Sequence, residues 1–273
     1  MRIATWNLNS AKARLPRMIE WLQSRRPDVL LAQETKATDE SWPAAEFTEL
    51  GYQSAHLGNG RWNGVAILSR VGLDEVTYGL DAQPEFEGAS EPRAIGAVCG
   101  GLRLWSLYVP NGRELGHAHY RYKLDFLAAV QAQATAERAR YGDGTGFGLL
   151  GDYNVAPFDA DVWDIAAFDG LTHVSAPERD AVTAIRAGSG ADELVDLRPR
   201  ASEDRADARP AYTFWEMRML GFAKGRGMRI DLALVNPALA DRVTDVWVDR
   251  DARKGAAPKA PSDHAPLVLD LSD

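Results

Sequence analysis

Short runs of apolar residues alternate with polar turns along most of this chain, a pattern typical of a strand-rich protein with few helices. Apolar positions three or four residues apart predict three helices: one from Ala11 to just before Pro27, one from Tyr120 towards Arg140, and a shorter one around 176–187. Runs bounded by Gly, Asn or Pro predict the strands. The strands are expected at 2–7, 28–34, 52–56, 65–69, 75–78, 94–99, 103–109, 147–154, 229–235, 243–248 and 265–271.

This order of elements favours a single α/β domain over the whole chain, residues 1–273. Hairpin and crossover connections are mixed and helices are few, so we expect two packed sheets with helices outside them. The segments with the weakest pattern, 81–92, 202–210 and 251–261, are too short to predict a linker between domains.

Several predicted strands end in side chains that carry chemistry, where an ordinary chain would show a plain turn. The apolar run from Phe147 ends in Asp152 and Asn154, which the alternation of a strand places on one side of the chain. A carboxylate beside a carboxamide suits a bound cation and an activated water. Similar groups end or open other strands, namely Asn7 and Asn9, Glu34, and Asp263 with His264, and Asp231 lies inside a further apolar strand.

Each of these residues also has an ordinary structural interpretation. Asn7 could be a turn former, Glu34 a surface residue and Asp263 a loop residue. Asp231 differs, because an unpaired charge inside an apolar strand is costly, and a histidine imidazole is its expected partner. Polar groups at so many strand boundaries together favour a site at the rim of the sheets.

Composition narrows the classes of function. The formal net charge of −8 argues against a protein that coats nucleic acid through bulk electrostatics, although basic residues cluster at 113–123 and 218–229. The single cysteine, Cys99, excludes an internal disulfide and a cysteine-based zinc site, and its apolar surroundings predict an inert buried thiol. No stretch approaches the length and apolarity of a membrane span, and a strand begins directly after Met1, so we expect a cytoplasmic protein.

The polar segments together resemble the exonuclease III family, the bacterial abasic-site endonuclease branch of the endonuclease/exonuclease/phosphatase superfamily. They occur in the order seen in that family, and the resemblance runs from residue 2 to about 271. The matching segments are Ala4-Thr5-Trp6-Asn7, Gln33-Glu34-Thr35-Lys36, Tyr108-Val109-Pro110-Asn111-Gly112, Gly151-Asp152-Tyr153-Asn154-Val155, Arg229-Ile230-Asp231 and Ser262-Asp263-His264-Ala265-Pro266.

The resemblance implies a four-layer α-β-β-α sandwich of two mostly antiparallel mixed sheets, with the site at one edge of both. It also implies a Mg²⁺-dependent hydrolase, with Mn²⁺ as a substitute, that cleaves double-stranded DNA 5′ to abasic sites and leaves a 3′-hydroxyl. Activity on blocked 3′ ends, as a 3′→5′ exonuclease and a 3′-phosphatase, is implied as well. Nothing in the sequence indicates an obligate assembly, so we expect a monomer.

The resemblance also implies a metal and water cluster. Glu34 would be the principal metal ligand, with Asn7 and Asp263 close to the ion directly or through water. Asp152 would orient or deprotonate the attacking water near the metal, and Asn154 would hold that water in place.

The remaining implied roles concern the phosphate. Asp231 would fix the ring of His264, which would contact the scissile phosphate, while Tyr108 and Asn111 would bind phosphate oxygens. Whether Asp152 or His264 is the formal base cannot be settled from these residues alone.

Residues for DNA recognition carry a weaker signal. Phe214 and Trp215 lie in a segment similar to the one whose aromatics, in the family, pack against a flipped-out abasic sugar; a place in the core is the ordinary alternative. Contacts with the DNA backbone are expected from Arg93, which has a family counterpart, and from Arg113, Lys123, Arg179 and Lys224, although each also fits an ordinary surface charge.

Two other interpretations stay open. One keeps the superfamily but changes the substrate to a phospholipid or an inositol phosphate; the segments at 108–112 and 214–215 favour DNA. The other is a scaffold that binds a partner without catalysis, and the retained carboxylates and His264 speak against it.

Overall fold

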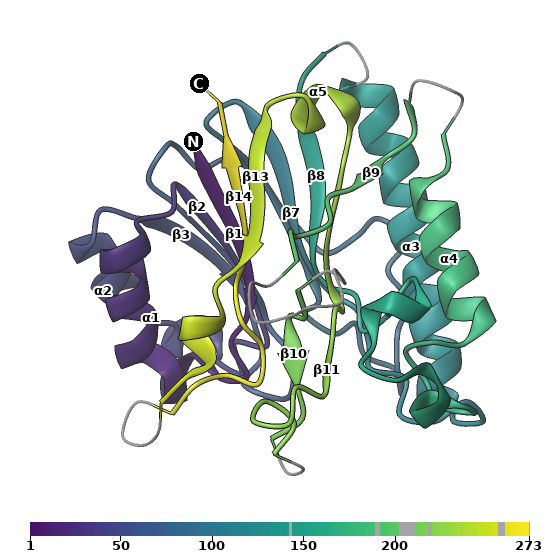
Figure 1. Cartoon of the computed structure of the whole chain (residues 1–273). Coiled ribbons are helices and arrows are strands. Elements are labelled where there is room, and N and C mark those ends of the chain that lie inside the picture. The colour runs from purple at the N-terminus through teal and green to yellow at the C-terminus, as the bar shows by residue number, and fades with distance from the viewer. Residues whose placement is uncertain (142–143, 189–191, 202–210, 218–219, 256–259, 273) are drawn as a thin grey trace.

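Two six-stranded sheets lie face to face, with helices on both outer sides, in the computed structural model (Figure 1). This four-layer arrangement confirms the α-β-β-α sandwich that the resemblance implied. The structure describes residues 1–141, 144–188, 192–201, 211–217, 220–255 and 260–272.

The first sheet is mixed. Its strand order is β13 (Val243–Val248), β14 (Leu267–Leu271), β1 (Arg2–Asn7), β2 (Val29–Gln33), β4 (Val65–Ser69) and β3 (Gln53–Leu57). Strands β1 and β2 run parallel, joined by the crossover helix between them, and the other neighbours are antiparallel.

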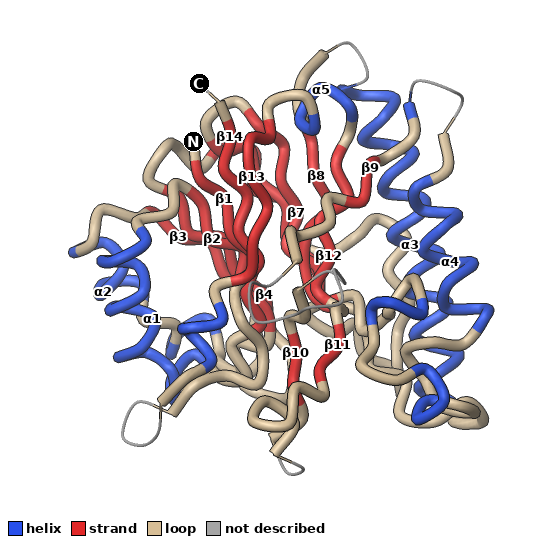
Figure 2. Tube along the Cα trace, in the orientation of Figure 1, coloured by secondary structure: helices blue, strands red, loops and turns tan. Residues whose placement is uncertain are grey.

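The second sheet has the same character. Its order is β5 (Asp74–Tyr78), β6 (Ala94–Cys99), β7 (Leu102–Tyr108), β8 (Phe147–Asp152), β12 (Asp231–Val235) and β9 (Val195–Asp196). Here β7 and β8 form the parallel pair. A separate short ribbon pairs β10 (Phe214–Trp215) with β11 (Gly227–Met228) and lies below the sheets in Figure 2.

The helices divide between the two outer faces. Helices α1 (Ala11–Arg25) and α2 (Ala44–Glu49) cover the first sheet, and α3 (Ala118–Tyr141) and α4 (Ala176–Arg186) cover the second (Figure 1). Among the described residues, no helix combines the length and apolarity needed to cross a membrane. The remaining helical turns are α5 (Pro237–Ala240) and the short 3-10 segments Asp39–Ser41, Asp159–Asp161, Ile165–Phe168 and Arg250–Arg253.

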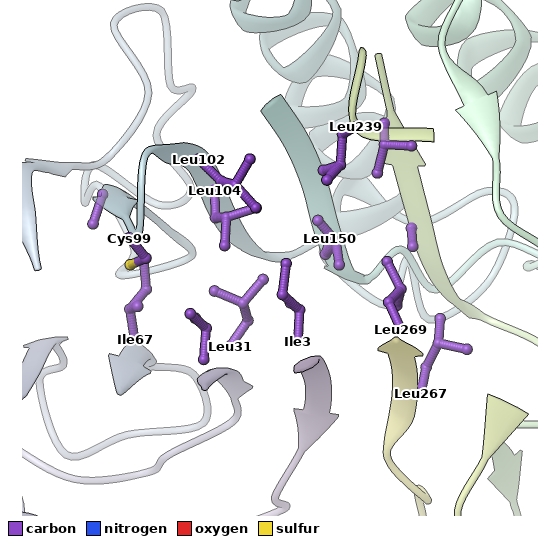
Figure 3. Close-up of a cluster of buried hydrophobic side chains, with 14 of the residues drawn as sticks. Ile3, Leu31, Ile67, Cys99, Leu102, Leu104, Leu150, Leu239, Leu267 and Leu269 are labelled. Atoms are coloured by element: carbon purple, nitrogen blue, oxygen red, sulfur yellow. The ribbon is translucent and has the colours of Figure 1, made fainter. Parts of the chain in front are cut away.

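The central core lies between the sheets. Ile3, Leu31, Leu104 and Leu150 meet there and are fully buried (Figure 3). Burial of each such side chain contributes about 1.5–3 kcal/mol, so this layer fixes how the two sheets register against each other. Cys99 belongs to the same core, and burial raises the pKa of its thiol to about 11, which confirms the predicted inert cysteine.

The strand predicted at 229–235 begins two residues later than expected, which corrects the sequence prediction. Strand β11 ends at Met228 and β12 begins at Asp231. Between them the N–H of Arg229 donates to the carbonyl oxygen of Asp161, and the fully buried guanidinium of Arg229 pairs with Asp161 and Asp196. Asp231 therefore opens a strand at the rim of the sheet instead of lying within one.

Stability is expected to fall as the pH drops from about 6.5 towards 4, in part through His119. Burial first, then the charges of Arg93 and Arg113, lower the pKa of His119 to about 4, and its Nδ1 accepts the N–H of Gly112 at 3.1 Å. Between pH 6.5 and 4 this imidazole is protonated in the unfolded chain but stays neutral in the folded chain. The contribution of His119 to the free energy of unfolding, which is present above pH 6.5, is therefore lost as the pH falls.

Chemical denaturation at pH 7 and pH 5 measures this loss. We expect His119→Gln to reduce the loss of unfolding free energy between pH 7 and pH 5 by on the order of 1 kcal/mol. If the difference in unfolding free energy between pH 7 and pH 5 were the same in His119→Gln, the loss would not come from His119.

Candidate active site

The polar strand ends meet at one edge where the two sheets approach each other. Asn7 ends β1 beside the end of β2, Tyr108 and Asp152 are paired at the ends of β7 and β8, and Asp231 lies opposite Asp152 in register. Strand pairing therefore brings together the ends of β1 and β2 in one sheet and of β7, β8 and β12 in the other.

Asn7 connects the two sheets. Its Nδ2 donates to Glu34 Oε1 at 2.8 Å and to Asp152 Oδ2 at 2.9 Å. Its Oδ1 accepts the N–H of Asn9, so the amide end faces both carboxylates. Asn7 thus orients two acidic groups, and its oxygen is already engaged by the backbone.

Asp152 is held on one side by Asn154. The backbone N–H of Asn154 donates to Asp152 Oδ1 at 2.8 Å, and its side-chain Nδ2 lies 3.3 Å from Oδ2. Asn154 adopts a left-handed φ of 50°, which is uncommon for a residue with a side chain. Gly151 precedes the pair because a Cβ there would lie 2.0 Å from the carbonyl oxygen of Leu107.

His264 lies on the other side of Asp152 and is fixed from behind by Asp231. Its Nδ1–H donates to Asp231 Oδ2 at 2.8 Å, and its Nε2 lies 3.8 Å from Asp152 Oδ2. Thr213 accepts the backbone N–H of Asp231, which fixes the start of β12. The imidazole therefore lies between two buried carboxylates, and its pairing with Asp231 is the one that was expected.

The charges of this cluster shift its proton equilibria. Burial alone lowers the pKa of His264, but the negative charges of Asp231 and Asp152 outweigh it and raise the pKa to about 10. Burial, assisted by the charges of Asp231 and Glu34, raises the pKa of Asp152 to about 7. At neutral pH the imidazole is a cation and Asp152 is the group able to take up a proton.

Tyr108 lies beside Glu34. Burial first, then the negative charge of Glu34, hold the pKa of Tyr108 well above its usual range, so the phenol stays protonated. Arg93 stacks over the Tyr108 ring at 4.7 Å and donates to its carbonyl oxygen.

A second group of oxygen atoms surrounds Lys36. Its ammonium pairs with Glu34 at 2.9 Å and donates to Asn9 Oδ1 at 2.7 Å, and Asn9 in turn donates to Asp263 at 3.0 Å. Asn9, Glu34 and Lys36 all have positive φ, so the loops that carry these groups are tightly constrained.

The donor set suits a hard cation with few protein ligands. Within the described ranges no group of three or more His, Cys, Asp or Glu side chains could enclose a metal ion. Glu34, which pairs with the Lys36 ammonium, and Asp263, which accepts from Asn9, offer carboxylate oxygens to an ion that keeps most of its own water.

Comparison with known proteins places this geometry in a family. The model of the Endonuclease/Exonuclease/phosphatase family matches residues 4–264. The chain belongs to this family. This chain is 27% identical over 282 residues to an exodeoxyribonuclease III from Haemophilus influenzae, with 98% of each chain covered. This similarity confirms the resemblance to exonuclease III.

Solved structures of this family are similar over the full length. A 3′-5′ exonuclease from Neisseria meningitidis has a TM-score of 0.87 at 33% identity, covering 99% of each chain. An AP endonuclease from Archaeoglobus fulgidus has a TM-score of 0.86 at 32% identity, covering both chains completely. A 3′ phosphatase from Neisseria bound to a product DNA hairpin has a TM-score of 0.87 at 33% identity, covering 100% of this chain and 99% of that chain.

Of the two aromatic residues expected to face a substrate, the structure exposes one. Phe214 is half-buried beside His264, with ring centres 4.9 Å apart, and it packs against Met228 and Ile230. Trp215 is 1% exposed and packs on Phe222 in a separate cluster. The expectation that Trp215 touches a substrate is therefore wrong, because the indole lies in the core against Phe222.

Two of the basic residues expected on the DNA backbone are also buried. Arg93 is 4% exposed and its Nε pairs with Glu91, so it acts on Tyr108 from behind. Lys123 is fully buried under the site and pairs with Glu178. Both carry charges that a sequence pattern cannot distinguish from surface charges. Arg113 and Lys224 remain exposed, as expected, and Arg179 is half-buried.

His173 is a site residue that the sequence did not indicate. Its Nδ1–H donates to the carbonyl oxygen of Asn154 at 2.5 Å, and its Nε2 lies 3.5 Å from the amide of Asn111. Burial, followed by the charge of Lys123, lowers the pKa of His173 to about 4, so the ring is neutral. Its ring contacts residues 19 and 62 positions away in the sequence, and no local motif marks it.

Proposed function

We propose that this protein is a divalent-metal-dependent DNA-repair phosphodiesterase. It incises double-stranded DNA 5′ to abasic sites to leave a 3′-hydroxyl, and it removes nucleotides and phosphate groups from 3′ ends. The observation that carries the proposal is Asp152 held between Asn7 and Asn154 and facing a His264 imidazolium that Asp231 fixes. The exonuclease, phosphatase and AP endonuclease names of the similar structures support the same class of substrate.

The chemistry follows from the proton states of the cluster. Asp152 accepts a proton from the attacking water, because its pKa of about 7 leaves much of it ionised at neutral pH. His264 is already a cation, so it cannot serve as that base; its Nε2–H donates to a phosphate oxygen. The new bond joins water oxygen to phosphorus, the bond from phosphorus to the 3′ oxygen breaks, and the leaving 3′ oxygen takes a proton from solvent to become the 3′-hydroxyl.

Other residues orient the phosphate and the metal. Tyr108 and Asn111 supply donors at the same edge. Glu34 and Asp263 would hold Mg²⁺, or Mn²⁺ in its place, which when bound neutralises charge on the phosphate and on the leaving oxygen. A monomer in the cytoplasm, with Cys99 reduced, completes the proposal.

Cleavage of two defined duplexes tests this function. One duplex carries a single tetrahydrofuran lesion and the other a nick with a 3′-phosphate, and the termini of the products are identified. We expect magnesium-dependent products with 3′-hydroxyl ends, and no products in EDTA. Absence of cleavage of both duplexes with Mg²⁺ and with Mn²⁺ would refute the proposal, and turnover of a sphingomyelin or inositol phosphate instead would assign the site to a different ester.

Trp62 is expected to bind DNA at the rim of the site. It is 79% exposed, and its ring centre lies 5.7 Å from the ammonium of Lys36, which contacts Glu34. An aromatic face next to a phosphate site suits stacking against a base, worth about 1–3 kcal/mol. We expect Trp62→Ala to weaken duplex binding about tenfold by fluorescence anisotropy.

Val195 provides the control for this prediction. It is an exposed apolar residue on β9, opposite Val235 and near the start of β8, so it lies at the end of the sheet away from the site. Val195→Ala is expected to leave binding unchanged. Equal affinities of both variants and the unaltered protein would show that Trp62 does not face DNA.

A further inference from the structure

A buried ion pair lies directly beneath the two loops that carry Asn111 and Asn154. Lys123 on α3 pairs with Glu178 on α4, and both side chains are fully buried. Taking two charges out of water is costly, and an apolar pair of similar size generally stabilises a core at least as well. The pair therefore calls for an explanation other than packing.

The lysine binds both site loops through their backbones. Its Nζ donates to the carbonyl oxygen of Asn154 at 2.6 Å and to that of Asn111 at 3.2 Å. Asn154 is the residue with the left-handed backbone whose N–H and amide hold Asp152. A charged donor on its carbonyl stabilises a conformation that the chain would otherwise rarely adopt.

The glutamate holds a third loop in the same place. Its Oε1 accepts the hydroxyl of Thr172 at 2.6 Å and the N–H of His173 at 3.0 Å, and its Oε2 accepts from Ser175. The ring of His173 contacts the carbonyl oxygen of Asn154 and the side-chain amide of Asn111. One ion pair thus determines the positions of three loops around the phosphate-binding side of the site.

The two carboxamides depend on this arrangement for their direction. Asn111 Nδ2 lies 3.3 Å from Asn154 Oδ1, while Asn154 Nδ2 lies between the carbonyl oxygen of Val109 and Asp152. A shift of either backbone would turn its amide away from the group it serves. Misplacement by about 1 Å is enough to cost about a hundredfold in rate.

We propose that Lys123 and Glu178 are positioning residues that set the backbones of Asn111 and Asn154, and through them the orientation of Asp152 and of the bound phosphate. The inference rests on the proposed function for its kinetic consequence. It does not depend on that function for the geometry of the two asparagine side chains.

The kinetic test uses the double variant Lys123→Met, Glu178→Gln. The amide of Gln keeps an acceptor for Thr172 and His173, while the bonds to both carbonyls are lost. We expect kcat on the nicked and lesion duplexes to fall about 10- to 100-fold, with KM and DNA affinity within about threefold. In a background that already carries Asn111→Ala and Asn154→Ala, the same double variant should cost less than about twofold, because the groups it positions are gone.

The matched control is another buried ion pair on α3. Arg103 and Glu137 lie 3.3 Å apart, and Arg103 is at the end of β7 opposite to Tyr108. Arg103→Met, Glu137→Gln removes a comparable pair and is expected to leave kcat within about twofold. Equal losses of kcat in both double variants would show that Lys123 and Glu178 have only a structural role. The same loss of kcat in the background that carries Asn111→Ala and Asn154→Ala would show this too.

An NMR measurement separates this inference from the proposed function. Side-chain amide signals of Asn111 and Asn154 in the metal-free protein should move in the Lys123/Glu178 variant and stay in place in the Arg103/Glu137 variant. Should the first variant not fold, Thr172→Val removes the hydroxyl between the two charges and should move the same signals by less. Unmoved amide signals overturn the inference even if the enzyme cleaves DNA, and moved signals support it even if DNA is not the substrate.

Discussion

Replacing Asp152 with asparagine is expected to lower kcat on duplex DNA by about 10³- to 10⁴-fold. The carboxylate is the group able to accept the proton of the attacking water, and Asn7 and Asn154 hold its two oxygens in place. Affinity for DNA should be unchanged or higher, because the variant removes a negative charge that faces the phosphate. Single-turnover kinetics and anisotropy measure the two quantities separately.

Asp125 offers a control for the loss of one negative charge. It lies on the exposed side of α3, and Asp125→Asn should leave kcat within about twofold. If Asp152→Asn retained more than a tenth of the activity, Asp152 would not be the base.

Loss of the imidazolium is expected to have the next largest effect. His264→Gln should lower kcat by about 10²- to 10³-fold, since the cation that faces the phosphate is lost. Asp231→Asn should cost a similar factor, because Asp231 is the main cause of the raised pKa of His264 and binds its Nδ1. The two groups act as one unit, so the double variant should be little worse than His264→Gln alone.

Asp231→Asn is also expected to change the dependence of activity on pH in a defined direction. With Asp231 present, the pKa of about 10 keeps His264 charged through neutral and mildly alkaline pH. Without that negative charge the folded-state pKa falls, so activity that needs the imidazolium is lost as the pH rises through a lower value. The alkaline limb of Asp231→Asn should therefore lie at lower pH than in the unaltered protein, and a coincident limb would contradict the pairing.

The rim of the site was largely predictable because its residues lie at the ends of strands. Asn7, Glu34, Asp152 and Asp263 each follow or precede an apolar run, and such runs identify the strands and the edge at which they stop. Asp231, which the sequence placed inside an apolar strand, likewise predicted a partner, and His264 is that partner. Local patterns of this kind also indicated the two sheets and the three longer helices.

Burial of charged and aromatic residues was not predictable in the same way. Arg93, Lys123 and Arg229 look like surface residues in sequence, yet all three are buried. Lys123 and Arg229 pair with acids far along the chain, whereas Arg93 pairs with Glu91 two residues before it. Trp215 follows Phe214 directly, and the alternation of β10 turns one ring towards His264 and the other into the core. His173 was missed because the two residues that its ring contacts, Asn154 and Asn111, lie on other loops, 19 and 62 positions away in the sequence.

Hydrolysis in ¹⁸O-labelled water tests the central claim most directly. A duplex with one abasic analogue and a duplex with a 3′-phosphate are cleaved with magnesium, and the products are weighed by mass spectrometry. Attack of an Asp152-bound water on phosphorus predicts one ¹⁸O in the 5′-phosphate terminus or in the released phosphate, and none in the 3′-hydroxyl. Label in the 3′-hydroxyl, or label incorporated equally well by Asp152→Asn, would contradict the account.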